Sequence, residues 1–516
     1  MALLRSIATV GGYTMVSRIL GFVRDILIAA MLGAGLVADA FFVAFKLPNF
    51  FRRLFAEGAF NAAFVPLFAR HMSDGGRDNA RAFAEEVIAV FVVLLLFFVT
   101  ALQIAMPWVV HGFAPGFVGD PERFDLAVAL TQITFPYLLF ISLVSQLGGV
   151  LNALGRFAAA AATPIILNIC LIAALLGLAP LVETPGHALA WGVAAAGAAQ
   201  FVWLMVACHR AEFSLRLRRP RLTSRVRGLL RLMLPGAIGA GVVQVNLLID
   251  VVIASLLPAG SVSFLYYADR VNQLPLGVIG VAIGTALLPL LSRQIRAGQT
   301  ADAETSMNRA LEFALLLTVP GALALMAIPD PIVRVLFQRG EFGVADTNAT
   351  AMALGAYAIG LPAYVLIKVL APGFFAREDT ATPVKIAALC VGINLALNLA
   401  LMDLLKHVGI ALATAVSAWV NVALLYALLR RRGHLTLDAR LRRVLPRTIA
   451  AAVGMAAVLW LARDALAGFA AAGTAQDAVA LAILIAVGLV VFAVLAVVTG
   501  AASVADVKRM LDRSPG

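Results

Sequence analysis

Long apolar runs, broken by short polar connections, dominate the chain. Twelve such segments follow residue 87, and each is long enough for a helix that crosses a bilayer. They lie near residues 87–110, 126–155, 157–182, 184–208, 232–256, 262–292, 313–329, 347–371, 386–402, 408–429, 448–466 and 478–505. Two earlier segments, near residues 4–30 and 36–57, have helical length but are interrupted by charges, so hydropathy alone scores them poorly. The pattern predicts about 14 transmembrane helices.

The composition excludes a water-soluble fold. Of the 516 residues, 62% are hydrophobic and 13% are charged, and the mean hydropathy is +0.96. The runs are continuous rather than alternating, which argues against an outer-membrane barrel. The first 30 residues carry charges where a cleavable signal peptide has one apolar stretch, so we expect the first segment to remain in the mature protein. An all-α polytopic membrane protein is therefore predicted.

The distribution of lysine and arginine predicts the orientation. Of the 40 basic residues, 28 lie at the N-terminus, in even-numbered loops or in the C-terminal tail, and only five lie in or beside odd-numbered loops. Because basic loops stay on the cytoplasmic side, both termini are expected in the cytoplasm. The densest clusters, Arg210 to Arg231 and Arg430 to Arg447, follow the sixth and twelfth segments.

These clusters divide the segments into groups of six, six and two, which suggests an internal duplication. Pro66 to Arg70 and then Gly75 match Pro289 to Arg293 and then Gly298, with an offset of 223 residues. Two six-helix lobes are therefore predicted, related by a pseudo-two-fold axis along the membrane normal, with a central cavity between them. The predicted parts are an N-terminal lobe at 1–209, a basic cytoplasmic linker at 210–231, a C-terminal lobe at 232–432, and two additional helices with a cytoplasmic tail at 433–516.

Ionisable residues within the predicted spans are the candidate functional groups, because a charge in the bilayer costs roughly 2.5–3.5 kcal/mol unless it has a partner or an aqueous cavity. We expect a cationic chamber that binds an anionic headgroup such as phosphate, since the arginine fork binds phosphate oxygens in pairs and keeps its charge. The candidate binding residues are Arg18, Arg24, Arg52, Arg53 and Arg270. The candidates for a cavity or gating role are Asp25, Asp39, Lys46, Asn49, Glu57, Asp269, Gln273 and Lys368.

Two features of these spans bear on the shape of the predicted chamber. Arg18 and Arg24 lie about 120° apart around a helix, so they can border one wide cavity without sharing a stripe. Pro48 is expected to break the second segment and to present free backbone groups to a ligand. The alternative is that Arg24, Arg52 and Arg53 lie near helix ends and extend toward lipid headgroups, with nearby acids as their partners.

Enzymatic chemistry has little support in the sequence. No two of the six histidines lie within five residues of each other, and no phosphate-binding Walker loop is present. The acidic pairs Asp74 with Asp78 and Glu85 with Glu86 are interpreted as solvated charges at helix ends rather than as metal ligands. No cofactor, no metal and no nucleic-acid partner is expected, and transport is the predicted class of function.

Five motifs resemble one family of membrane proteins. They are SRILGFVRD at 17–25, DAFFVAFKLPN at 39–49, RRLFAEGAF at 52–60, YYADR at 266–270 and KVLAPGF at 368–374. Together they strongly resemble the MurJ (MviN) family of bacterial lipid II flippases, within the MOP exporter superfamily. The resemblance runs through essentially the whole chain.

The resemblance implies a protein of the bacterial inner membrane that moves lipid II, the undecaprenyl-diphosphate disaccharide-pentapeptide, between leaflets by alternating access. It also implies a last pair of helices that forms a groove for the polyprenyl tail, and functional roles for Arg18, Arg24, Arg52, Arg270 and Asp39. Gln273 stands where some relatives have glutamate, so an acidic gating or coupling role is not expected there, although its amide can form hydrogen bonds. A monomeric transport unit, contacts with membrane lipids and a coupling ion are further expectations. The alternative is another MOP-type carrier, for polysaccharide lipids or drugs.

Overall fold

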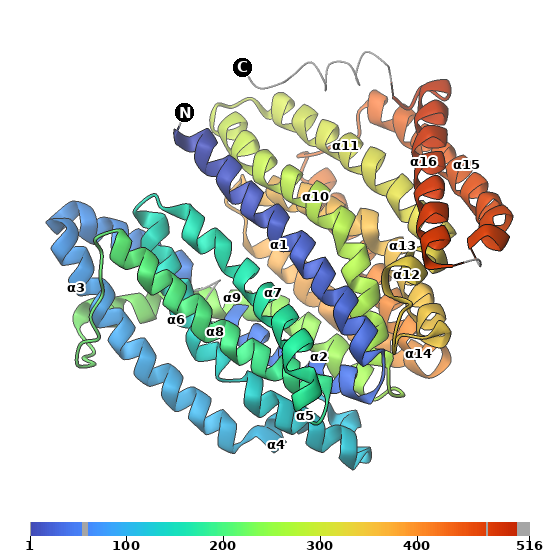
Figure 1. The fold of residues 1–516 in the computed structure, drawn as a ribbon. Helices are drawn as coiled ribbons and strands as arrows, with labels where there is room; N and C mark the ends of the chain where they lie inside the picture. The colour runs from blue at the N-terminus through green and yellow to red at the C-terminus, as the bar shows by residue number, and fades with distance from the viewer. Residues whose placement is uncertain (1, 54–59, 471–472, 503–516) are drawn as a thin grey trace. The chain divides into compact units, whose positions relative to one another are not determined.

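The structure is a computed structural model that describes residues 2–53, 60–470 and 473–502, and every regular element in these ranges is a helix (Figure 1). The helices up to the middle of the chain are α1 (Ala2–Leu32), α2 (Leu36–Phe51), α3 (Asn61–Ile104), α4 (Met106–Phe113), η2 (Pro115–Gly119), α5 (Pro121–Thr134), α6 (Tyr137–Ala153), α7 (Phe157–Gly177), η3 (Ala179–Leu181), α8 (Pro185–Arg210) and α9 (Ser224–Ser255). Those that follow are α10 (Ser261–Arg296), α11 (Thr300–Ala327), α12 (Pro329–Phe337), α13 (Val344–Phe375), α14 (Ala381–Arg431), α15 (Ala439–Ala470) and α16 (Thr474–Val498).

The all-α prediction is confirmed, while the number of spans stays a prediction. Nine stretches of the described chain are long and apolar enough to cross a membrane, including α3, the α5 and α6 pair, and α14. The kink of α14 at Lys406, where φ is +50°, falls between the predicted spans 386–402 and 408–429. The long helices α1, α9 and α10 and the 16-residue helix α2 are not among the nine.

The duplicated motif has similar local geometry in its two copies. In α3 the helical conformation is interrupted at Gly75 and Gly76, with φ of +68° at Gly76. In the second copy α10 ends at Arg296 and Gly298 follows with φ of +74°. In both copies the helical conformation that follows the matched proline stops near the matched glycine, but the left-handed residue is Gly298 itself in the second copy and Gly76, one residue after the matched Gly75, in the first.

The chain divides into two compact units. The first comprises residues 1–263 and 339–342, and the second comprises 264–338 and 343–516. The predicted linker at 210–231 therefore lies inside the first unit.

In the first unit, α1 packs along α7, α7 along α8, α2 against α5, and α3 against α6. The basic connection after α8 is fastened to the middle of α3. Glu85 is 2% exposed, accepts a hydrogen bond from the backbone N–H of Arg216 at 3.0 Å and pairs with Arg218 at 2.5 Å. Glu86 accepts a hydrogen bond from Thr223 at 2.8 Å. The interpretation of Glu85 and Glu86 as solvated helix-end charges was wrong, because the arginine-rich connection folds back over α3 and supplies their partners.

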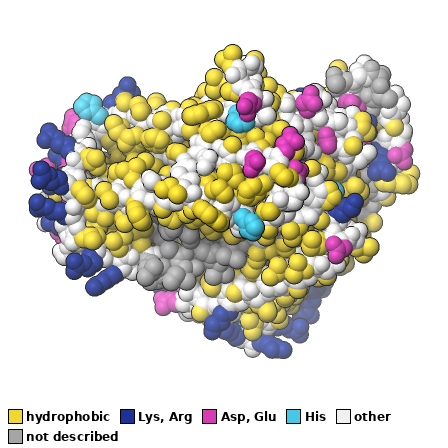
Figure 2. Space-filling model, turned by 90° about the horizontal axis from the view of Figure 1, so that it is seen from below, with side chains coloured by type: hydrophobic (Ala, Val, Ile, Leu, Met, Phe, Trp, Pro, Cys, Tyr) yellow, Lys and Arg dark blue, Asp and Glu magenta, His cyan; other side chains and the backbone are white. Residues whose placement is uncertain are grey.

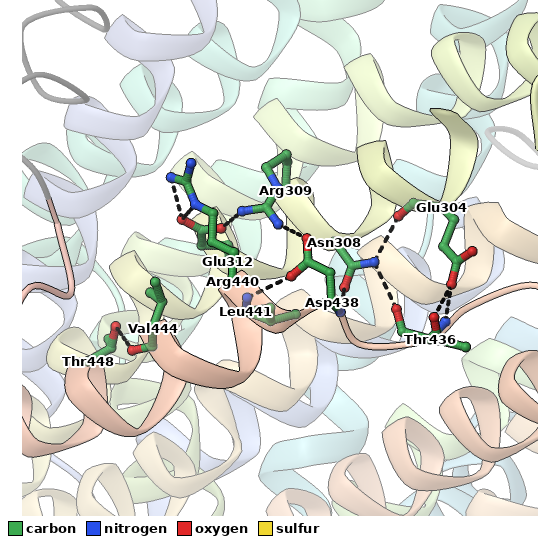
Figure 3. A network of polar contacts seen from close by, with 10 residues as sticks. All are labelled: Glu304, Asn308, Arg309, Glu312, Thr436, Asp438, Arg440, Leu441, Val444 and Thr448. Carbon is green, nitrogen blue, oxygen red and sulfur yellow. Dashed lines mark hydrogen bonds and ion pairs between the residues drawn. The ribbon is translucent and has the colours of Figure 1, made fainter. Parts of the chain in front are cut away.

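In the second unit, α13 packs against α11 and α14, and α15 packs against α11 and α16. A polar network fastens the start of α15 to α11 (Figure 3). Arg309 on α11 bridges Glu312 and Asp438, and Arg440 also pairs with Glu312, at 2.9 Å. Asp438 caps α15 by accepting a hydrogen bond from the N–H of Leu441 at 2.7 Å. The helix α15 thus has a polar attachment to α11 as well as helix packing, and α16 packs against α15.

Large apolar side chains cover much of the surface. Figure 2 shows one face on which hydrophobic side chains predominate and lysine and arginine gather toward its margins. Phe97 on α3 is 75% exposed and Leu489 on α16 is 68% exposed. Apolar exposure of this extent suits helices that face lipid rather than water.

Candidate functional site

Arg24, one of the two candidate arginines on α1, is buried, and its guanidinium is held by hydrogen bonds. Its guanidinium pairs with Asp25 at 2.7 Å and donates to Oδ1 of Asn168 on α7 at 2.9 Å. The amide of Asn168 donates in turn to the carbonyl of Ser17 on α1 at 2.9 Å. The side chains of Arg24 and Asp25 are only 6% and 0% exposed. This arrangement neutralises most of the Arg24 charge inside the first unit and holds its guanidinium in one direction.

Arg18 lies on a different side of α1. Its side chain belongs to an exposed stretch, whereas Arg24, six residues on, is buried. The two arginines therefore do not share a stripe, as the helical geometry predicts. Arg18 is exposed, whereas Arg24 is enclosed between α1 and α7.

Asp39 in the first turn of α2 is a fully buried charge that is surrounded by donors. It is 0% exposed and forms an ion pair with Arg123 on α5. Its carboxylate also accepts hydrogen bonds from the N–H of Gly260 at 2.7 Å, and from the N–H of Ser263 at 2.8 Å and its hydroxyl at 2.6 Å. The positive φ of Gly260, +93°, shapes the turn that aims its N–H at the carboxylate.

These four donors use essentially the whole acceptor capacity of a carboxylate. Ser263 lies in the first turn of α10, so the negative charge of Asp39 also meets the positive end of that helix. The guanidinium of Arg123 stacks on the ring of Phe117 at 3.8 Å. Asp39 thus ties together α2, α5 and the start of α10.

The predicted break at Pro48 does not occur. The helix α2 continues through Pro48 to Phe51. A proline has no N–H to donate to the carbonyl four residues earlier, and here the hydroxyl of Thr134 on α5 donates to that carbonyl, on Ala44, at 3.0 Å. A neighbouring helix therefore replaces the missing hydrogen bond, and the helix needs no break.

The end of α2 orients Arg52. Nε of Arg52 donates to Oδ1 of Asn49 at 3.1 Å, while the Asn49 amide donates to the carbonyl of Phe45 at 2.8 Å. Arg52 and Lys46 are half-buried, and Arg53 is exposed. Glu57 lies outside the described residues. Asn49 is thus a positioning group for Arg52.

The candidates of the second unit lie on α10 and α13. Asp269 and Arg270 are half-buried, and Gln273, one turn later, donates its amide to Asp269 at 2.5 Å. The amide at this position therefore engages an acid on its own helix. Lys368 on α13 lies against Gly280 of α10, since a Cβ at Gly280 would fall 2.9 Å from the lysine Nζ.

Three residues with clear structural roles were missed by the sequence analysis: Asn168, Arg123 and Thr134. Each forms its hydrogen bond or ion pair with a residue that is distant in the sequence and belongs to another helix. The need of Asp39 for a positive partner was a usable signal for Arg123, which is an unusual arginine in a poorly basic, odd-numbered loop. For Asn168 and Thr134, the sequence contains no comparable signal.

Comparisons with known proteins establish the family. A family described as lipid II flippase MurJ matches residues 28–499. The chain belongs to the MurJ family. It is 47% identical to a probable lipid II flippase MurJ of Rhizobium meliloti (strain 1021), over 99% of this chain and 97% of the relative. It is 38% identical to a lipid II flippase MurJ of Burkholderia cenocepacia, over 84% of this chain and 85% of the relative.

Solved structures agree with this assignment. A structure of lipid II flippase MurJ in an inward-closed conformation is similar with a TM-score of 0.78 and 26% identity, over 95% of this chain and 98% of that one. An inward-facing multidrug transporter of the MATE family, in the MOP superfamily, has a TM-score of 0.67 over 83% of this chain and 98% of that one. At 14% identity the second likeness concerns the fold alone. The MurJ family comprises transporters rather than enzymes, and the chain is a polytopic protein of the inner membrane.

Proposed function

We propose that the chain moves lipid II from the cytoplasmic to the periplasmic leaflet of the inner membrane. The observation that carries this proposal is the MurJ match across residues 28–499, which includes three of the candidate arginines, Arg52, Arg53 and Arg270, whereas Arg18 and Arg24 precede it on α1. The substrate combines an anionic diphosphate with an apolar tail. Its headgroup needs a polar path through the bilayer, while the tail can stay in lipid.

The arginines supply the electrostatic part of that path. Moving an isolated ion into a medium of low dielectric constant costs on the order of 20 kcal/mol by Born estimates. Arg18 and Arg52, which are less buried than Arg24, are proposed to contact the diphosphate directly. Arg24 is held by Asp25 and Asn168 and is proposed to form the wall behind them. Arg270 on α10 is proposed as a further contact of the diphosphate.

Transport is proposed to occur by alternating access of a monomer. In this mechanism the headgroup site opens first to the cytoplasm and then to the periplasm, driven by a coupling ion or the membrane potential. Lys46, Asp269, Gln273 and Lys368 are proposed to line or gate this path. Lateral contacts with membrane lipids follow from the exposed apolar helices.

A different cargo is the second candidate, because the fold is shared with multidrug transporters. Cationic drugs are disfavoured by a chamber whose candidate ligands are mostly arginines. A neutral or anionic polysaccharide lipid is a closer competitor. Headgroup selectivity separates these possibilities.

The direct test is transport by the purified protein in liposomes that contain lipid II. An enzyme that modifies only externally exposed lipid II should gain access to the inner pool when the protein is present. We expect no comparable transport of a polyprenyl phosphate that lacks the disaccharide-pentapeptide. Unchanged lipid II accessibility, together with transport of another lipid-linked sugar, would contradict the proposal.

The cytoplasmic position of both termini is proposed from the distribution of basic residues. A single cysteine at the exposed position Arg221, in a variant without its three native cysteines, tests it. We expect an impermeant thiol reagent to label it only after the inner membrane is opened. Labelling in cells with an intact inner membrane would reverse the assigned orientation.

A further inference from the structure

A cavity of about 320 Å³ lies in the second unit, among α12, the end of α15 and the start of α16. Its charged lining consists of Asp330, Arg334, Arg463, Asp464 and Asp477. Leucine and valine side chains of the same helices complete the wall, and they belong to the apolar core that α12, α15 and α16 share. None of these residues belongs to the candidate transport site described above.

The charges of the cavity do not balance. Arg334 pairs with Asp330 at 2.5 Å, and Arg463 pairs with Asp464 at 3.2 Å. The third carboxylate, Asp477, reaches Arg334 only at 3.9 Å, which is beyond hydrogen-bond distance. Three carboxylates and two guanidiniums leave one negative charge in excess, and Asp477 is the acid with the weakest pairing. An ammonium group beside Asp477 would give this carboxylate the close partner that the two arginines do not supply.

The cavity lies where apolar helices end. The apolar stretches of α11 and α15 finish beside it at Ala327 and Phe469, and that of α16 begins there at Ala475. Trp460 on α15 is 50% exposed and stacks with the guanidinium of Arg463 at 5.5 Å. Trp460 lies about one helical turn before Arg463, and half-exposed tryptophan near a charged group on an apolar helix is typical of the membrane–water interface.

Exposed apolar side chains adjoin this end of the helices. Leu461 on α15 and Ile485 on α16 are both more than half exposed. Hydrocarbon can pack on them while a polar group occupies the charged cavity. The geometry therefore suits an amphipathic ligand with its cation next to apolar chains, which is the arrangement of a phospholipid.

We propose that this cavity binds the headgroup of a zwitterionic phospholipid with a primary ammonium group, of the phosphatidylethanolamine class. The ammonium binds at Asp477, the phosphate lies toward Arg463, and the acyl chains follow α15 and α16. A primary ammonium has three N–H donors for carboxylates, whereas the trimethylammonium of phosphatidylcholine has none. The site therefore discriminates between two lipids that have the same net charge.

Lipid retention by the purified full-length chain tests this proposal independently of transport. The protein is exchanged into matched mixed micelles with equal amounts of phosphatidylethanolamine and phosphatidylcholine that share their acyl chains, and bound lipid is counted by native mass spectrometry. We expect retention of phosphatidylethanolamine to be favoured roughly tenfold, as for one charge-assisted hydrogen-bonded contact. Asp477→Asn should remove most of that preference, and Asp464→Asn should reduce it.

Asp302→Asn is the matched control, because Asp302 is an acid in the first turn of α11 just as Asp477 is in the first turn of α16. The control should keep the preference of the wild type. Equal retention of the two lipids by the wild type overturns the proposal. An unchanged preference in both Asp477→Asn and Asp464→Asn, or an equal loss in Asp302→Asn, also overturns it. Thermal unfolding of each variant in the same micelles identifies any variant that has lost its fold. If one of Asp477→Asn and Asp464→Asn has unfolded, the lipid preference of the other tests the proposal.

Discussion

Asp39 and Arg18 lie on consecutive helices of the first unit, yet their surroundings are opposite. Asp39 is fully buried and accepts hydrogen bonds or an ion pair from Arg123, Gly260 and Ser263. Arg18 is exposed on the surface of α1. Both carry charge within a predicted transmembrane helix. The difference shows that a charge within a predicted span can hold helices together, as Asp39 does, or lie on the exposed side of its helix, as Arg18 does.

Replacing Asp39 and replacing Arg18 should differ most in their effects on protein stability. Asp39→Ala leaves the guanidinium of Arg123 buried without its partner, because the side chain of Arg123 is only 4% exposed. We expect a loss of about 3–5 kcal/mol in the free energy of unfolding and poor accumulation of the protein. Thermal unfolding in detergent measures this, with Arg18→Ala as the comparison. Near-normal stability of Asp39→Ala would remove the structural interpretation of this acid.

Transport should show the reverse order. Arg18→Ala should fold normally, yet lower lipid II flipping at least tenfold, since a lost charge-assisted contact to a desolvated phosphate costs roughly 2–5 kcal/mol. Arg18→Lys should keep part of the activity, because it restores charge without the planar fork. The exposed Arg53 is the internal control, and Arg53→Ala should be tolerated better. Wild-type flipping by Arg18→Ala, Arg24→Ala and Arg270→Ala together would eliminate the cationic chamber.

The polar network between α11 and α15 should give a smaller effect, because its ion pairs are partly exposed. Asp438→Ala removes the cap of α15 and one partner of Arg309. We expect a cost of about 1–2 kcal/mol, with faster amide hydrogen exchange at the start of α15. Asp302→Ala, on an exposed turn of α11, should leave exchange there unchanged. Equal amide hydrogen exchange at the start of α15 in the two variants would show that the apolar contacts alone hold α15 against α11.

The smallest effect is expected in the turn between α13 and α14. The guanidinium of Arg432 donates to Asp379 at 2.6 Å, and this contact, with hydrogen bonds from Thr382, holds the pKa of the Asp379 carboxyl well below its usual range. A depressed pKa means that the contribution to stability is fully present above the unfolded-state value, about 4. It is lost as the pH falls below that value toward the folded-state pKa.

Amide exchange in this turn, compared at pH 5 and pH 3, measures the effect. Asp379→Asn should make the exchange less dependent on pH after correction for intrinsic rates, and the wild type should open more at pH 3. Equal opening at the two pH values in the wild type would exclude a role for this carboxylate.

The contrast between Asp39 and Arg18 also shows which features could be predicted from the sequence and which could not. Apolar runs and basic loops predicted an all-helical membrane fold, because the bilayer permits few alternatives. The same rule identified the charged residues worth attention. Their partners could not be predicted, since Arg123 is 84 residues from Asp39 and Asn168 is 144 residues from Arg24. The prediction of a break at Pro48 failed for the same reason: it considered the proline within one helix, while the compensating hydroxyl comes from another.

The bond from Thr134 to the Ala44 carbonyl has a consequence for assembly. Until α5 is in place, α2 in lipid has a carbonyl that its own backbone cannot satisfy, at a cost of several kcal/mol. Thr134 is synthesised 90 residues after Ala44, which takes about 5–18 s at typical elongation rates. During that interval a newly made α2 gains from staying near water or the insertion machinery rather than moving freely into lipid. The order of synthesis thus favours joint release of α2 and α5 into the bilayer as a pair.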